Sequence, residues 1–321
     1  MTTEKNTIDD LLKTHGKRIQ PDDLMKKRAM KNVKSHWQAK LKRQQTQQKQ
    51  RHKILIRIAA SVLLVTTVVF LMQSNLQEHN PQILKDFYVN GEVQVSRDGK
   101  TWEAANQHDF KKNIWIKTND NSFANLTLLD NSQIRLNHNS QIQVFSASQI
   151  TLHNGAIYHD ADNINTTNPL LITTSLGNIQ HIGTRYMVNK TDIDLKVSVR
   201  NGIVKVSHDA MSKTIASGKQ LLMNSTGKLQ EIDITPYDSM WHWTHGADKP
   251  FQSEGKSLHD FIVWYAHENG YDINWNTLQN KTKKVRLTGN VSGLAKSQQI
   301  KAIFLSTKFD YKINQGILSI L

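Results

Sequence analysis

The sequence predicts a mainly β protein with a small α+β domain at its C-terminus, preceded by one transmembrane helix and a short helical region. Three observations support this fold class. Apolar and polar residues alternate from residue 83 to about 226, a helical period returns after residue 247, and an unbroken apolar run fills residues 54–72. The predicted divisions are residues 1–53, 54–73, 83–228 and 247–321.

The apolar run predicts the transmembrane helix. Its nineteen residues would rise about 28 Å as a helix, close to the roughly 30 Å of a bilayer's hydrocarbon core. Arg57, its only charge, lies one turn from the start, where its side chain can reach the headgroups. A buried helix of a soluble protein and a cleaved signal peptide are the alternatives; the second lacks a cleavage site in "QSNLQEHN".

Charge is distributed unevenly about this run. The formal net charge is +14, and residues 1–57 hold 16 basic and 5 acidic residues, a net +11 of that excess. The positive-inside rule then places residues 1–53 in the cytoplasm and residues 73–321 outside it. Topology and attraction to anionic lipid explain the basic segment better than DNA binding does.

Residues 1–53 predict two helices, the second beginning after Pro21. One face of this second helix carries the apolar residues Met30, Val33, Trp37 and Leu41. So narrow a stripe cannot build a core, so the segment is either a solvated basic stalk or a docking helix that folds on a partner. Trp37 favours docking.

In the β region, turn signals recur every eight to ten residues. Residues 124–145 alternate through turns at Asp130–Ser132 and Asn139–Ser140, and Asn201-Gly202 in "DIDLKVSVRNGIVKVS" is the preferred pair of a type I′ hairpin. This spacing predicts a β-sandwich, roll or solenoid.

The C-terminal pattern predicts helices that cover one face of a small sheet. Ser257 and Asp260 form a capping box before the helical face of "SLHDFIVWYAHEN", and Gly270 stops that helix. A strand at "YDINW", a second helix around "LAKSQQIKAIFLST" and a hairpin in "FDYKINQGILSIL" follow.

The sequence contains no motif that indicates a catalytic or metal-binding site. The chain has no Cys, which excludes thiolate and Cys-ligated chemistry, and it has no P-loop, GxGxxG or GxSxG. His242 and His245 lack the Glu of a zinc motif, and "HDADN" at 159–163 lacks the Gly and distal Glu of a calcium loop. We therefore expect no metal, no cofactor and no small-molecule enzyme.

The segment "LGNIQHIGTRYMV", residues 176–188, interrupts a strand-like run with polar residues and glycines. His181 has no partner in sequence that would make it a general base. Gly183-Thr184 is either a β-bulge or a reactive bond, and the residue types alone favour the bulge.

Four segments together resemble the periplasmic domain of the FecR family of Gram-negative membrane regulators. They are "NLTLLDNSQIRLNHNSQIQV", "LLITTSLGNIQHIGTRYMV", "LKVSVRNGIVKVS" and "IASGKQLLMN", covering about residues 85–226. Asn131 stands where the family usually has Gly, which still allows a turn. The C-terminal "FQSEGKSLHDFIVWYAHENGYDINW…LTGNVSG" resembles the small domain that follows in many members, related to the STN (secretin and TonB N-terminal) fold.

The resemblance implies an anti-sigma regulator of the inner membrane, of the kind that controls iron uptake. It implies that a TonB-dependent outer-membrane receptor contacts the periplasmic part and that the cytoplasmic part holds an extracytoplasmic-function sigma factor. The cytoplasmic region departs from the best-known members and looks like a shorter variant that ends at His36-Trp37, which puts the sigma-factor partner in question. A membrane-anchored periplasmic scaffold without a sigma factor is the alternative.

Contact residues follow from these roles. Met30, Val33, Trp37 and Leu41 are the candidate sigma-factor contacts. The candidate receptor contacts are Trp241, Trp243, Trp264 and Trp275, each of which suits a core position equally well.

The resemblance also bears on Gly183-Thr184, because some members cleave themselves between the Gly and Thr of this signature. The Thr184 hydroxyl would attack the Gly183 carbonyl, and water would open the resulting ester. An autoprocessing protein is thus a third hypothesis.

Overall fold

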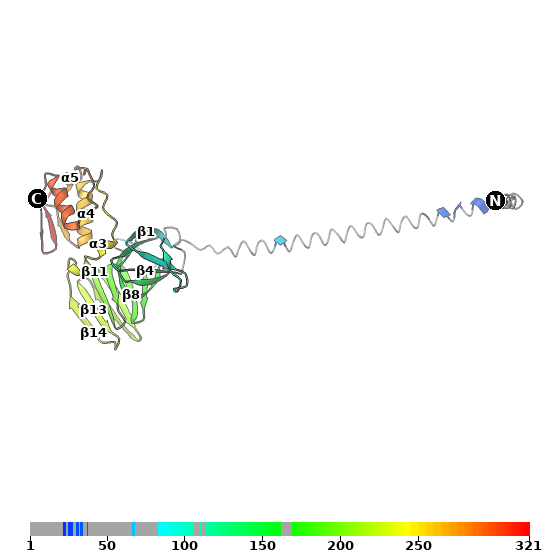
Figure 1. The fold of residues 1–321 in the computed structure, drawn as a ribbon, viewed down its shortest axis with the longest axis horizontal. Helices are drawn as coiled ribbons and strands as arrows, with labels where there is room; N and C mark the ends of the chain where they lie inside the picture. The colour runs from blue at the N-terminus through cyan, green and yellow to red at the C-terminus, as the bar shows by residue number, and fades with distance from the viewer. Residues whose placement is uncertain are drawn as a thin grey trace, which may run out of the picture. The chain divides into compact units, whose positions relative to one another are not determined.

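The computed structural model describes residues 83–105, 110, 113–161 and 169–321, together with scattered positions between 22 and 37 and Thr66–Thr67. The chain divides into two compact units, Met1–His79 and Asn80–Leu321. The second unit holds fourteen described strands of one β domain, followed by the helices and three-stranded sheet of a C-terminal domain (Figure 1).

The β domain begins at β1 and ends at β14. Its strands are β1 (Leu84–Asn90), β2 (Val93–Ser96), β3 (Glu103–Ala104), β4 (Ile114–Thr118), β5 (Phe123–Leu128), β6 (Gln133–Leu136), β7 (Gln141–Ser146), β8 (Gln149–Asp160), β9 (Leu171–Thr174), β10 (Gly177–Lys190), β11 (Asp194–His208), β12 (Met211–Ala216), β13 (Lys219–Asn224) and β14 (Leu229–Asp233). The turns predicted at Asp130–Ser132 and Asn139–Ser140 are confirmed, and Asn131 and Asn139 there have positive φ.

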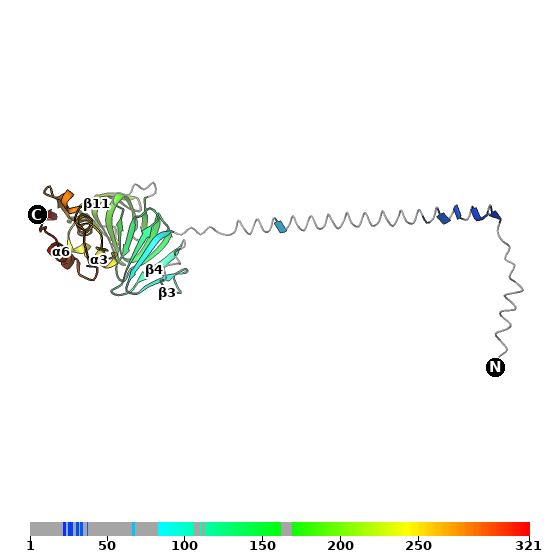
Figure 2. The ribbon, with the colours of Figure 1, turned by 90° about the horizontal axis from the view of Figure 1, so that it is seen from above.

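All fourteen strands are hydrogen-bonded into one network, and the three long strands β8, β10 and β11 each run through both of the sheets that it contains. The first sheet runs β3-β2-β4-β7-β8-β9-β10-β11-β12, and the second runs β1-β5-β6-β8-β10-β11-β13-β14. Figure 2 shows β3 and β4 in the first of these sheets. One half of each long strand pairs in one sheet and the other half in the second. The result is a two-layer β roll around one apolar core.

The prediction of a hairpin turn at Asn201-Gly202 is wrong. β11 continues through both residues, and the register against β10 shifts there, with Arg185 opposite Asn201. Gly202 has φ +85°, so the Asn-Gly pair supplies the positive φ of a bulge inside a strand rather than of a turn between two strands. The strand passes from one sheet to the other at this bulge.

The C-terminal domain follows a connecting segment that contains the 3-10 helix η1 (Ser239–Trp241) and α3 (Thr244–Ala247). Its elements are α4 (Leu258–Asn269), β15 (Asp272–Asn274), α5 (Gln279–Thr282), α6 (Lys296–Leu305), β16 (Tyr311–Asn314) and β17 (Ile317–Ile320). The capping box of Ser257 and Asp260 is confirmed, and so is the stop at Gly270 in the left-handed region. β17 pairs with β15 in parallel and with β16 antiparallel, and α4 and α6 supply most of a separate apolar core.

The N-terminal expectations fall largely on residues that the structure does not describe. The predicted transmembrane segment at 54–73 lies outside the described residues, apart from Thr66 and Thr67. Among the residues that are described, no helix has the length and hydropathy to cross a membrane.

Candidate functional site

Gly183 and Thr184 lie at the bend of β10, opposite the bulge of β11. Gly183 has φ +56°, and the pairing with β11 is interrupted between Ile182 and Arg185. A Cβ added at Gly202 would lie 2.5 Å from the Gly183 carbonyl oxygen, so the two bends touch through backbone. The structure therefore places the segment singled out by sequence at a double bend.

Thr184 is fully buried at this bend. Its hydroxyl donates to the carbonyl oxygen of Ile203 at 2.8 Å, and its own carbonyl accepts from the Ala161 N–H at 3.2 Å. The hydroxyl proton is thus directed across the bulge, towards β11. This geometry suits a β-bulge.

His181 on β10 lies two residues before Gly183, and His159 on β8 lies directly opposite Tyr186 of β10. Their rings lie 4.5 Å apart at 76°, and both side chains are buried. His181 Nε2 accepts from the Leu170 N–H at 3.0 Å, so its proton is on Nδ1. Within the described residues His181 Nδ1, both nitrogens of His159 and the Tyr186 hydroxyl have no hydrogen-bond partner.

Burial keeps this pair neutral. It lowers the pKa of His181 to about 4 and lowers the pKa of His159 well below its ordinary value, with a further lowering from His181. The Nδ1 of His181 carries a proton and offers no lone pair, so the two rings do not form a metal-ligand pair as they stand. No group of three or more His, Asp or Glu side chains in the described part of the chain could hold a metal ion.

A second cluster of titratable side chains lies where the C-terminal end of α4 meets the β domain. Arg135 on β6 makes a bidentate ion pair with Glu268 on α4, through contacts of 2.5 and 2.9 Å, and its guanidinium lies 3.7 Å from Asp248. Lys296 at the start of α6 binds Asp248 at 2.8 Å. Sequence reasoning did not find this cluster.

The charges of the Arg135–Glu268 pair support each other. Burial lowers the pKa of Arg135, but Glu268 outweighs that effect and the net pKa is raised. Burial likewise raises the pKa of Glu268, but the charge and hydrogen bonds of Arg135 bring it well below the usual range. Burial, followed by repulsion from Glu268, raises the pKa of Asp248, and burial lowers that of Lys296.

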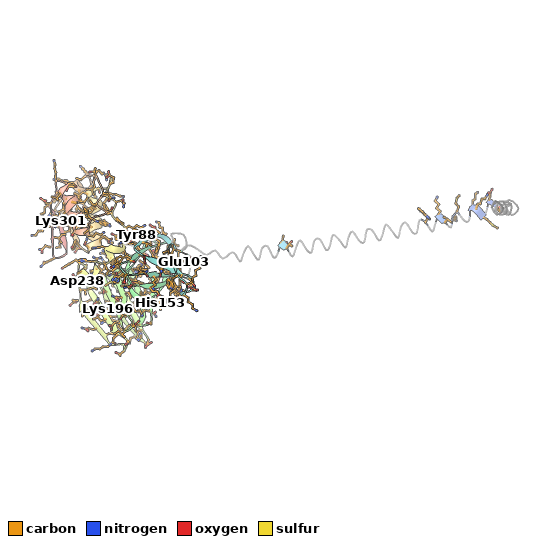
Figure 3. The ribbon with its side chains drawn as sticks, viewed as in Figure 1. Tyr88, Glu103, His153, Lys196, Asp238 and Lys301 are labelled. Carbon is orange, nitrogen blue, oxygen red and sulfur yellow. The ribbon has the colours of Figure 1, made fainter. Side chains whose placement is uncertain are left out.

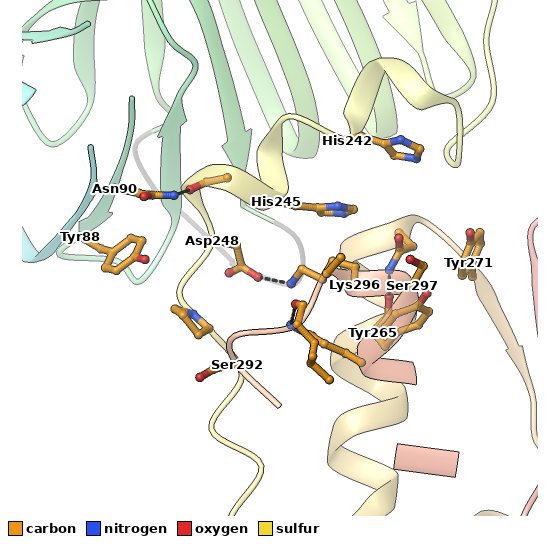
Figure 4. A pocket seen from close by; sticks show the side chains of 16 residues that line it. Tyr88, Asn90, His242, His245, Asp248, Tyr265, Tyr271, Ser292, Lys296 and Ser297 are labelled. Atoms are coloured by element: carbon orange, nitrogen blue, oxygen red, sulfur yellow. Dashed lines mark hydrogen bonds and ion pairs between the residues drawn. The ribbon is translucent and has the colours of Figure 1, made fainter. Parts of the chain in front are cut away.

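A cleft of about 670 Å³ opens beside this cluster (Figure 4). Its walls come from β1, the connecting segment, α4 and the start of α6, and they include Tyr88, His242, His245, Asp248, Tyr265, Tyr271 and Lys296. His242 and His245 stack with ring centroids 5.7 Å apart, and burial, with Lys296 nearby, lowers the pKa of His245 to about 4. The histidines of "WHWTH" are therefore interfacial.

The four candidate receptor-contact tryptophans take different environments. Trp241 is fully buried, donates to the Thr235 carbonyl and lies under Arg200, so it occupies a core position. Trp243 is half-buried against Met187. Trp264 and Trp275, in the C-terminal domain, are also half-buried; Trp264 packs against Phe251 with the rings tilted, and Trp275 stacks on His259.

The candidate sigma-factor contacts are described in part. Met30, Val33 and Trp37 are helical and exposed, with Trp37 66% exposed. Leu41 lies outside the described residues.

Comparisons with known proteins agree with the resemblance seen in the sequence. Residues 115–205 match the family model described as "FecR protein", a span from β4 to the second half of β11. No curated protein matches the chain. Two crystal structures, at 2.50 and 1.65 Å resolution, of a candidate anti-sigma factor from Parabacteroides distasonis ATCC 8503 align over 64% of this chain and 97% and 98% of their own. Both are 16% identical with a TM-score of 0.36, too low to support an argument.

The matched span contains the turns of β5 to β7, the double bend at Gly183-Thr184 and the three strand arginines Arg135, Arg185 and Arg200. It includes the first two of the four segments on which the resemblance rested and most of the third, while the fourth, "IASGKQLLMN", lies outside it. Over residues 115–205 the chain is similar to the FecR family.

Proposed function

We propose that the chain is a single-pass membrane regulator of the anti-sigma type. In this proposal the N-terminal region binds an extracytoplasmic-function sigma factor in the cytoplasm, and residues 83–321 receive a signal in the periplasm from a TonB-dependent outer-membrane receptor. The observation that carries the proposal is the FecR match to the β domain. The apolar run at 54–72 and the basic segment before it support the membrane topology.

The exposed helix residues support the cytoplasmic contact. Met30, Val33 and Trp37 are spaced so that they share one face of a helix, and an exposed tryptophan on such a face is a strong anchor for a partner protein. Met25 is 65% exposed on the same helical segment but lies more than a quarter turn from that face. It offers a matched control.

Co-purification tests this function. The full chain, extracted in detergent, should retain an extracytoplasmic-function sigma factor co-expressed with it, Trp37→Ala should lose it, and Met25→Ala should keep it. If the wild type retains no such sigma factor, and deletion of residues 1–45 leaves transcription unchanged, the scaffold alternative replaces the regulator.

We also propose that the Gly183-Thr184 bond can cleave itself, because the double bend holds a buried hydroxyl beside a peptide of positive φ. The Thr184 oxygen would bond to the Gly183 carbonyl carbon, the hydroxyl proton would pass to the departing amide nitrogen, and water would hydrolyse the ester. The products would be residues 1–183 with a new carboxylate and residues 184–321 with a free amine.

A denaturing gel of the wild type, Thr184→Ser and Thr184→Val tests this proposal. The wild type and the serine variant, which keeps a hydroxyl, should yield two fragments, while the valine variant of similar shape should run as one band. A single full-length band from all three would exclude cleavage.

A further inference from the structure

The β domain and the C-terminal domain do not share a hydrophobic core. Among the described residues the apolar side chains of the β roll form one cluster, and those of α4, α6 and β17 form another. A small third cluster, of Tyr158, Met187 and Trp241, packs the connecting segment against the β domain and contains no residue of the C-terminal domain. Something other than core burial must therefore supply most of the attachment.

An ion pair at the C-terminal end of α4 attaches the C-terminal domain to the β domain. The carboxylate of Glu268 is 95% buried and takes both guanidinium nitrogens of Arg135, whose side chain is 97% buried and lies over the Tyr158 ring. These residues are 133 positions apart in sequence, one in β6 and one in α4. Bidentate geometry between fixed partners makes this the strongest class of ion pair.

Two further arginines bind the carbonyls that end the helix. Arg200 donates to the Glu268 carbonyl oxygen at 3.1 Å, and Arg185 donates to that of His267 at 3.1 Å. The C-terminal end of a helix carries partial negative charge and unpaired carbonyls, so cations stabilise it. The close approach needs Gly270, because a Cβ there would overlap the carbonyl oxygen of Pro236 in the connecting segment.

A second ion pair extends the cluster to solvent. Lys296 binds Asp248 and lies 3.6 Å from the centre of the Trp264 ring, and both charged residues line the wall of the cleft in Figure 4. Water can therefore reach one side of the cluster. The charges of Arg135, Glu268, Asp248 and Lys296 sum to zero.

Such a junction can open without unfolding either domain. Separation would return four desolvated charges to water, which offsets much of the lost attraction, while the two apolar cores would stay intact. Separation of two domains with a shared core would instead expose that core. We propose that the C-terminal end of α4, held by Arg135, Arg185 and Arg200, is a latch that fixes the C-terminal domain to the β domain in a closed state and releases it as a folded unit in an open state.

The latch is independent of whether the chain binds a sigma factor. A distance measurement on the full chain in detergent tests it. The protein has no native Cys, so Lys196→Cys on β11 and Lys301→Cys on α6, both exposed and labelled in Figure 3, accept one spin label each. The distance distribution between the labels should be single and narrow in the wild type.

Glu268→Gln keeps the side-chain shape but removes the charge, and Arg135→Met removes the cation. Each should shift most of the spin pairs to a broad distribution at longer distance. Glu231→Gln is the matched control, since Glu231 pairs with Lys213 at the surface of the β domain, and it should keep the narrow distance. An unchanged narrow distribution in both latch variants would overturn the proposal.

Hydrogen exchange separates opening from unfolding. In Glu268→Gln the amides of residues 261–266, in the middle of α4, should remain as protected as in the wild type. Loss of that protection would mean that the ion pair holds the C-terminal domain folded, and would overturn the latch.

Discussion

The interior of the β roll and the junction with the C-terminal domain bury titratable groups in opposite ways. In the roll, His159 and His181 are kept neutral beside Tyr186 with several nitrogens unpaired, while at the junction Arg135 and Glu268 are kept charged by each other. Desolvation acts on both sites in the same direction, against charge. The difference is the partner: an opposite charge in bidentate contact at the junction, and another neutral ring in the roll.

This difference has a structural consequence. The core of the β roll is stabilised by the burial of apolar side chains, and protonation of His159 or His181 destabilises it. A junction that holds a complete ion pair is stabilised by complementarity and separates when one charge is removed. The predictions below test the two regions in order of decreasing effect.

The largest effect should come from the C-terminal core. Phe261→Ala removes a fully buried ring of α4 and should destabilise the C-terminal domain by about 3–5 kcal/mol. Because the two cores are separate, urea unfolding followed by hydrogen exchange should show an early transition for residues 258–320 while the β roll keeps the wild-type midpoint. A single shifted transition for both domains would contradict separate cores.

The double bend should be the next most sensitive position. Gly202→Val places a branched side chain at φ +85° and against the Gly183 carbonyl oxygen, and should cost about 2–4 kcal/mol in the free energy of unfolding of the β domain. Gly293→Ala is the control, since nothing lies within 4 Å of its added Cβ and its φ is not positive. Equal stability of the two variants would show that β11 can pass its bend without Gly.

Acid should weaken the β roll. The pKa of His181 is about 4 in the folded protein and about 6.5 unfolded, so below pH 6.5 the unfolded chain binds more protons and stability falls until about pH 4. His181 alone should remove about 2 kcal/mol at pH 5. His181→Gln should make the stability profile less steep between pH 6.5 and 4, with the slope due to His159 remaining, and His138→Gln, at an exposed histidine, should leave the profile unchanged. A wild-type profile flat over this range would refute the neutral pair.

The smallest effect concerns the start of α4. Ser257 accepts from the Asp260 N–H in the capping box, and Ser257→Ala should cost about 1 kcal/mol of C-terminal domain stability. Thermal unfolding of the variant measures this loss. No change would show that the capping box contributes nothing to the stability of α4.

Local signals predicted the elements well. Period-two alternation located the strands around Asn131 and Asn139, and capping chemistry located both ends of α4 at Ser257 and Gly270. These features depend on neighbours within a few residues, so the sequence contains their causes. The hairpin prediction at Asn201-Gly202 was wrong because a local signal cannot separate two structures here. The positive φ that this pair favours occurs both in a hairpin turn and in a bulge within a strand.

The junction could not be predicted in this way. The three arginines that contact the end of α4, namely Arg135, Arg185 and Arg200, all lie in strands. A charged residue in a strand is ordinarily predicted to face solvent, and these contacts form only because the tertiary fold brings α4 against the strands. The one available signal was Arg135, which lies between the apolar residues Ile134 and Leu136 in a short strand. Pairing it with Glu268 requires the tertiary fold.

The most direct test of the charged junction is a double-mutant cycle on Arg135 and Glu268. Each residue is changed to Met singly and together in the spin-labelled chain, and the free energy of opening is obtained from the populations at the narrow and the broad distance. We predict a coupling energy of about 2 kcal/mol or more, with the closed state of the double variant more stable than that of either single one. A coupling energy below about 0.5 kcal/mol would contradict it, because the two residues would then be acting independently.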